Sequence, residues 1–89
     1  MLNTVQVPFH RCGDGKRPLF AVQPGISVPE ALDSAYSLLD IAETLTLQRH
    51  GAKGAQQAQV DNACNFLISA AKATLQACIE SQASEAPAA

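Results

Sequence analysis

The sequence has no tryptophan and only four other aromatic residues, three Phe and one Tyr, among its 89 residues. Charged residues make up only 16%, and a net charge of −2 gives none of the basic excess that most nucleic-acid-binding proteins carry. No apolar run approaches the roughly 18 residues that a membrane span needs, and the N-terminus shows no secretory signal. We therefore expect a cytoplasmic protein that binds neither nucleic acid nor membranes.

Cysteine occurs three times, and an odd number indicates free thiols in a reducing compartment rather than a disulfide framework. If Cys64 and Cys78 lie on one helix, about 21 Å separates them along its axis, which is too far for a disulfide. We expect both to be small buried residues. Cys12 lies beside Arg11 in a glycine-containing turn, so a reactive thiol is an alternative there to a structural one.

Short apolar runs predict an N-terminal β-ribbon. Apolar side chains alternate with polar or proline residues at Val5, Val7 and Phe9. A Gly-Asp-Gly sequence within residues 10–17 predicts a turn, and residues 18–22 form a second apolar run. We place the ribbon and the turn that follows it in residues 1–25. Two strands alone are marginally stable in water, so the ribbon must pack on another element.

A capping box predicts the start of a first helix, which we place in residues 27–49. The hydroxyl of Ser27 can accept from the amide of Glu30, and the Glu30 carboxylate can reach back to the amide of Ser27. Pro29 falls in the first turn, where a missing amide costs nothing. The apolar residues recur with the 3.6-residue period of one broad helix face: Ala31, Leu32, Ala35, Leu38, Leu39, Ala42 and Leu45.

A second helix is predicted over residues 54–81, with a later start at Asp61 as an alternative. About two-thirds of its circumference is apolar or small on a wheel of 100° per residue. Residues 82–89 contain only small, polar and proline residues, so we expect a disordered tail. Residues 1–81 then form a single domain.

Two helices joined by a short loop form an antiparallel hairpin, and here both apolar stripes are wider than one helix–helix contact needs. We therefore predict a mainly α protein, a long helical hairpin with a short N-terminal β-ribbon, that forms a homodimeric four-helix arrangement. The alternatives are a monomer covered by its own ribbon and a hairpin completed by a different protein. The residues expected at the interface are Leu32, Ala35, Leu39, Ala42, Phe66, Leu67 and Ala71.

No cluster of residues predicts a catalytic, cofactor or metal site. Asp33 and Asp40 share a helix face, but it is the solvated one. His10 and Cys12 form a single pair, whereas structural zinc sites usually show two paired motifs. The glycines and lysine of residues 13–16 lack the spacing of a phosphate loop. We therefore expect a protein without cofactors that is not an enzyme.

Three runs together resemble a known family: LFAVQPGIS at residues 19–27, ALDSAYSLL at residues 31–39 and ACNFLISAAKATL at residues 63–75. The chain is similar to a family of short uncharacterised proteins, common in pseudomonads and classed only as a domain of unknown function. The resemblance covers roughly residues 19–76. It implies a small helical-hairpin fold and a bacterial cytosolic setting, and it supplies no catalytic residues.

Three functional hypotheses follow from these observations. The leading one is a small non-enzymatic protein-interaction or regulatory protein that self-associates through its helical hairpin. The second is a binding module for a small apolar ligand held between hairpins and lined by Tyr36, Phe66 and the cysteines. The third is a thiol-based sensor that uses Cys12.

Overall fold

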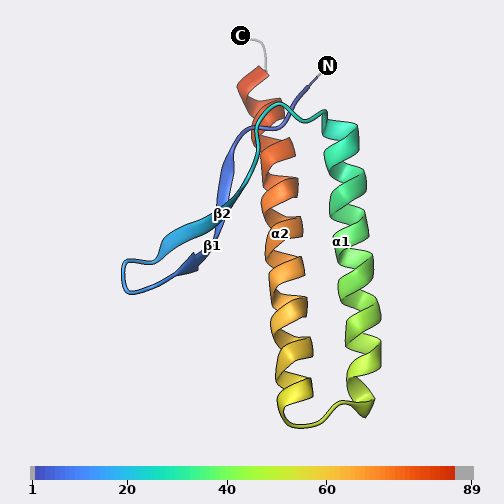
Figure 1. Cartoon of the computed structure of the whole chain (residues 1–89). Coiled ribbons are helices and arrows are strands. Elements are labelled where there is room, and N and C mark those ends of the chain that lie inside the picture. Colours follow the sequence, from blue (N-terminus) through green and yellow to red (C-terminus); the bar gives the residue numbers. More distant parts are fainter. Residues whose placement is uncertain (1, 86–89) are drawn as a thin grey trace.

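The computed structural model describes the backbone of residues 2–85 and shows two long antiparallel helices with a β-ribbon beside them (Figure 1). The elements are β1 (Val7–Cys12), β2 (Arg17–Val22), α1 (Val28–Gln48), the 3₁₀ helix η1 (Arg49–Gly51) and α2 (Ala55–Glu85). The predicted mainly helical chain with an N-terminal ribbon is confirmed. The ribbon lies on the α2 side of the hairpin and projects away from it (Figure 1).

The two strands pair antiparallel in a register that sets Val7 opposite Val22 and Cys12 opposite Arg17. The turn between them is tighter than expected, because it occupies residues 13–16 rather than 10–17. Gly13 adopts a φ of +77°, and the amide of Lys16 donates to its carbonyl at 3.1 Å. Positive φ costs glycine little, so the chain reverses within four residues and the strands extend further toward the tip.

The segment before β1 is tied to the turn before α1 by the buried side chain of Thr4. Its hydroxyl donates to the carbonyl of Gln23 at 2.8 Å and accepts from the amide of Ile26 at 3.1 Å. The amide of Val5 donates to the carbonyl of Ala77 in α2 at 3.5 Å. The alternating pattern predicts the first strand in this segment, but the segment instead joins the ribbon to both helices.

Helix α1 begins at the predicted capping box. The hydroxyl of Ser27 accepts from the amide of Glu30 at 3.4 Å and donates to its carboxylate at 2.7 Å. The carboxylate thus accepts from the hydroxyl rather than from the backbone amide that we expected. Pro29 lies in the first turn, as predicted. The helix then continues to Gln48, within the predicted range.

Helix α2 begins at Ala55, the earlier of the two predicted starts, and continues to Glu85. The predicted end at residue 81 is therefore wrong, as is the predicted disorder of residues 82–85. Glutamine, alanine and glutamate favour helix, and no glycine or proline interrupts the sequence before Pro87. The rest of the predicted tail, residues 86–89, lies outside the described residues.

The buried interior of the chain consists of small side chains. The buried apolar residues within 2–82 are alanines with Val7, Val28 and Cys78, and the largest fully buried side chain is that of Ser81. No Leu, Ile, Phe or Tyr in this range is buried. The radius of gyration is 15.6 Å, against about 12 Å for a compact domain of this length. The chain is therefore a thin, elongated layer rather than a globule with a large core.

Candidate functional site

Large apolar side chains on one side of the helical hairpin remain open to solvent. Leu32, Leu39 and Thr46 recur every seven residues on α1, and the hydroxyl of Thr46 lies 3.7 Å from the sulfur of Cys64 on α2. At 100° per residue, Ile68, Leu75 and Ile79 lie on or next to the flank of α2 that carries Cys64. We call the following residues the exposed helical face: Leu32, Leu39, Ile68, Leu75 and Ile79.

The exposed helical face is apolar and largely uncovered by the chain itself. Leu32 is 44% exposed, Leu39 41% and Ile68 41%, while Ile79 reaches 66% and Leu75 is half-buried. A helix pair that buried its own leucines would leave only polar side chains there. Leu32 and Leu39, two of the predicted interface residues, are thus accessible to a partner.

Three of the predicted interface residues are buried inside the chain. Ala35, Ala42 and Ala71 are 1%, 4% and 0% exposed, at helix positions that face the other helix. Their small side chains let α1 and α2 approach closely. The sequence pattern identified a helix–helix contact at these alanines, but it is the contact within the hairpin rather than one between two chains.

Phe66, also predicted at the interface, lies in an aromatic cluster beneath the ribbon. Its ring centroid lies 6.0 Å from that of Phe9, 5.4 Å from that of Phe20 and 5.3 Å from that of His10. This cluster joins the two strands to α2 and half-buries Phe66. Leu67, the remaining predicted residue, is half-buried as well.

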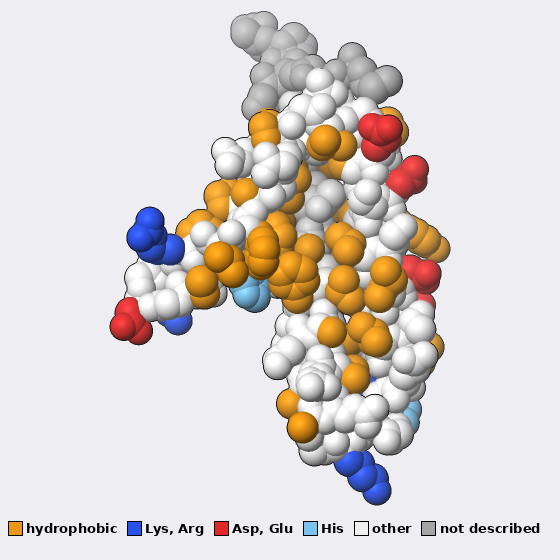
Figure 2. Space-filling model, viewed as in Figure 1, with side chains coloured by type: hydrophobic (Ala, Val, Ile, Leu, Met, Phe, Trp, Pro, Cys, Tyr) orange, Lys and Arg blue, Asp and Glu red, His pale blue; other side chains and the backbone are white. Residues whose placement is uncertain are grey.

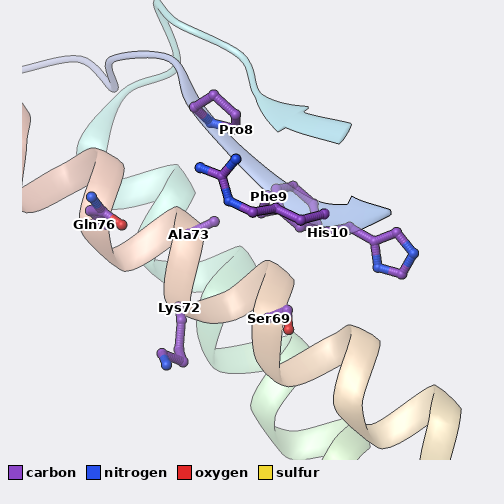
Figure 3. A pocket seen from close by; sticks show the side chains of 8 residues that line it. Pro8, Phe9, His10, Ser69, Lys72, Ala73 and Gln76 are labelled. Carbon is purple, nitrogen blue, oxygen red and sulfur yellow. The ribbon is translucent and has the colours of Figure 1, made fainter. Parts of the chain in front are cut away.

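A groove of about 220 Å³ runs between β1 and α2, and we call it the ribbon groove. Its lining includes Pro8 and Phe9 from β1 and Lys72 and Ala73 from α2 (Figure 3). Arg11 also lines it, with its guanidinium donating to the carbonyl of Lys16 at 3.1 Å. The other lining residues are His10, Ser69 and Gln76. Five of its eight lining residues are polar, two of them cationic, and no acidic residue lines the groove.

Acidic side chains gather on the other side of the molecule. Helix α1 contains four acidic residues and no Lys, Arg or His, and Figure 2 shows acidic side chains along its outer edge. We call Asp33, Asp40 and Glu43 the acidic edge. Asp40 and Glu43, with Tyr36 and Leu39, line an open hollow of about 200 Å³. Tyr36 is 73% exposed.

The three cysteines differ in exposure. Cys12 is exposed at the end of β1, Cys64 is half-buried and Cys78 is buried, and all three are free thiols. The expected burial is therefore correct for Cys78 but only partial for Cys64, whose sulfur lies 3.6 Å from the carbonyl of Ala42. Burial raises the pKa of the Cys78 thiol. Cys12 is thus the thiol most open to reagents.

The residues expected to line a ligand site do not meet within one chain. Tyr36 is exposed on α1, whereas Phe66 packs beneath the ribbon on α2. Within the described residues, no three His, Cys, Asp or Glu side chains lie close enough to hold a metal ion. That part of the chain also contains no helix with the length and hydrophobicity needed to cross a lipid bilayer. The pockets described above are open hollows, which suit contact with another molecule.

No curated protein and no solved structure matches the chain. A family model does match, over residues 4–81, and its description is "Protein of unknown function (DUF3077)". The match includes the β-ribbon, which the resemblance noted above covered only in part. It takes in both strands, α1 and most of α2. Since this is most of its length, the chain belongs to the DUF3077 family of proteins of unknown function.

Proposed function

We propose that the protein is a small non-enzymatic interaction or regulatory protein that self-associates through its exposed helical face. Two hairpins packed on this face form a dimeric four-helix arrangement. The observation that carries the proposal is the interior, in which no Leu, Ile, Phe or Tyr within residues 2–82 is buried. A chain with this many large apolar side chains gains stability when a second surface covers them.

The size of that gain favours a second hairpin. Full burial of a leucine or isoleucine stabilises by roughly 1.5–3 kcal/mol, so covering the remaining exposed part of each side chain adds about 1 kcal/mol. The seven-residue spacing of Leu32 and Leu39 suits packing along another helix. Side chains with this spacing form a ridge along the helix, and a face built from two helices can present one ridge on each helix.

The setting that we propose is the bacterial cytoplasm, in keeping with the likeness to short pseudomonad proteins. Three free cysteines fit a reducing compartment. The regulatory role is proposed because the surfaces on the described residues suit contact with other chains, and their chemistry suggests no reaction.

Sedimentation equilibrium of the purified protein tests the proposal. At about 1 M salt, which screens charged contacts between copies, we expect the wild type to sediment with the mass of a dimer. The double variant Leu39→Ser/Ile68→Ser should then sediment as a monomer with unchanged helical circular dichroism. Ile41→Ser is the matched control, because Ile41 is 49% exposed on the opposite flank of α1. It should remain dimeric. A wild type that stays monomeric at high concentration would rule the proposal out.

A thiol sensor is the second candidate, favoured by the exposure of Cys12. In that case oxidant changes the oligomeric mass or the binding of a partner in the wild type, and Cys12→Ser abolishes the change. Cys78→Ser is a poor control because Cys78 is buried, so Cys64→Ser serves instead. An equal response in the wild type and Cys12→Ser would remove this candidate.

A further inference from the structure

Most of the positive side chains lie on or beside the ribbon, and half of the negative ones lie on α1. Of its six Lys and Arg residues, four belong to the ribbon or line the ribbon groove: Arg11, Lys16, Arg17 and Lys72. Of its eight acidic residues, four lie on α1, which has no cation. Figure 2 shows basic side chains together with an acidic one at the tip of the projecting ribbon, whose turn contains Asp14, and acidic side chains along the far edge of α1. The ribbon side of the molecule therefore has an excess of positive charge, and α1 has an excess of negative charge.

These two regions cannot neutralise each other within one chain. The ribbon lies on the α2 side of the hairpin and projects away from α1, so α2 stands between the ribbon and α1 (Figure 1). The ribbon groove is lined from β1 and α2, whereas the acidic edge belongs to α1. Asp33, Asp40 and Glu43 make no ion pair within the described residues, and Arg49, which directly follows α1, pairs with Asp61 at 2.7 Å. Both regions are thus free to meet opposite charge on another molecule.

The two regions also carry matching apolar side chains. Leu19 and Phe20 on β2 are 62% and 44% exposed. On α1, Tyr36 is 73% exposed in the hollow that Asp40 and Glu43 share. Exposed ion pairs alone contribute little to binding free energy. A contact that combines ion pairs with apolar burial is therefore more favourable than ion pairs alone or apolar burial alone.

We propose that the ribbon groove of one copy binds the acidic edge of α1 of a second copy. In this contact Arg11 and Lys72 face Asp33 and Asp40, while Tyr36 packs on the exposed apolar side chains of β2. The contact joins two different surfaces, so each pair keeps one free groove and one free acidic edge. Because the contact is heterologous, successive copies form either a closed ring or an open filament.

A second copy suits the groove better than a nucleic acid does. The four acidic residues of α1 and the net charge of −2 repel a polyanion, whereas the acidic edge presents a short, limited set of carboxylates beside an aromatic ring. Its charged residues lie outside the exposed helical face, but Leu39 of that face lines the same hollow as Tyr36, Asp40 and Glu43. Salt distinguishes the two contacts, because it weakens the charged contact and leaves the apolar one.

Charge reversal tests the contact in the full-length protein. The groove variant is Arg11→Glu/Lys72→Glu and the edge variant is Asp33→Lys/Asp40→Lys, all at exposed positions. Lys53→Glu, in the loop between the helices, is the control. Sedimentation velocity is measured at about 0.1 M and about 1 M salt, where charges act over roughly 10 Å and 3 Å. Circular dichroism checks that each variant is folded.

At low salt we expect species larger than a dimer for the wild type and Lys53→Glu, and at least about tenfold weaker association for each reversed variant. A mixture of the two reversed variants should restore association, because each then meets the opposite charge. At high salt the larger species should disappear, while the apolar dimer of the helical face persists. Failure of the mixture to associate overturns the proposal. So does groove-dependent binding of a fluorescent single-stranded oligonucleotide.

Discussion

Thr4 shows what a single polar residue does in a chain with so small an interior. It is only 4% exposed, and its hydroxyl bonds to both sides of the turn that leads into α1. In the sequence, Thr4 is a polar residue in a pattern that alternates like a strand. That pattern does not predict that its hydroxyl bonds across the turn before α1. By contrast, the side-chain bonds of Ser27 were predictable, because the capping box is a local motif that needs only residues three apart.

Replacing Thr4 by valine keeps its shape and removes both hydrogen bonds. The amide of Ile26 then loses its only side-chain partner, and we expect the free energy of unfolding to fall by about 1–3 kcal/mol. Thermal and urea denaturation measure the loss. Thr44→Val is the control, because the Thr44 hydroxyl is exposed and bonds only to the carbonyl of Asp40, and its effect should stay within about 0.5 kcal/mol. Equal effects of the two variants would contradict the role given to Thr4.

Cys78 makes stability depend on alkaline pH. Burial raises the pKa of its thiol above the ordinary value of 9.0, whereas the thiol of the unfolded chain ionises near that value. The unfolded state therefore loses its proton first, so the contribution of Cys78 to stability is present below about pH 9 and is lost as the pH rises further. Urea denaturation at a series of pH values should show a shallower alkaline decline for Cys78→Ala than for the wild type. Cys12→Ser should decline like the wild type.

At the scale of the element, the alanines determine how closely the helices approach. Ala71 is fully buried on the side of α2 that faces α1. Replacing it by leucine adds volume to a contact with no room, and we expect a loss of about 1–3 kcal/mol in the free energy of unfolding. Ala58→Leu, at an exposed position of the same helix, should change it by less than about 0.5 kcal/mol. If Ala71→Leu is as stable as Ala58→Leu, the helices are less tightly packed than described.

The predicted helices correspond to the observed ones far better than the predicted strands do. Helix periodicity and caps are local signals repeated over many residues, so α1 begins and ends within the expected range. The first strand depends on pairing with residues far along the chain. Residues 4–6 alternate like a strand, yet they contact the turn and α2 instead, while residues 10–12 continue β1. The position of β1 is determined by its pairing with β2, and the local sequence pattern contains no information about that pairing.

At the scale of the whole molecule, the missing large-residue core predicts a concentration-dependent stability. If the folded chain associates through the exposed helical face, mass action stabilises it, and the melting temperature rises with protein concentration. Differential scanning calorimetry over a hundredfold range of concentration measures the rise. Leu39→Ser/Ile68→Ser should melt at a constant, lower temperature. A wild-type melting temperature that does not change with concentration would show that the single chain is the complete folding unit.

The candidate surfaces were only half predictable from the sequence. Helix periodicity correctly indicated more apolar surface than one hairpin hides, and it selected Leu32 and Leu39. It could not say which apolar flank faces the other helix, so Ala35, Ala42 and Ala71 were assigned to the wrong contact. The ribbon groove could not be found at all, because it joins residues about 60 positions apart in the sequence.

The packing of β1 on α2 has a consequence for the order of folding during synthesis. Val7 packs on Ala73 and Ala77 of α2, so the ribbon, which is synthesised before α2, has no helix to pack on until α2 has been translated. Until then the apolar side chains of the nascent ribbon, including its exposed phenylalanine and leucine, are not covered by α2. The packing of the ribbon joins segments far apart in the sequence, and contacts of this kind slow folding.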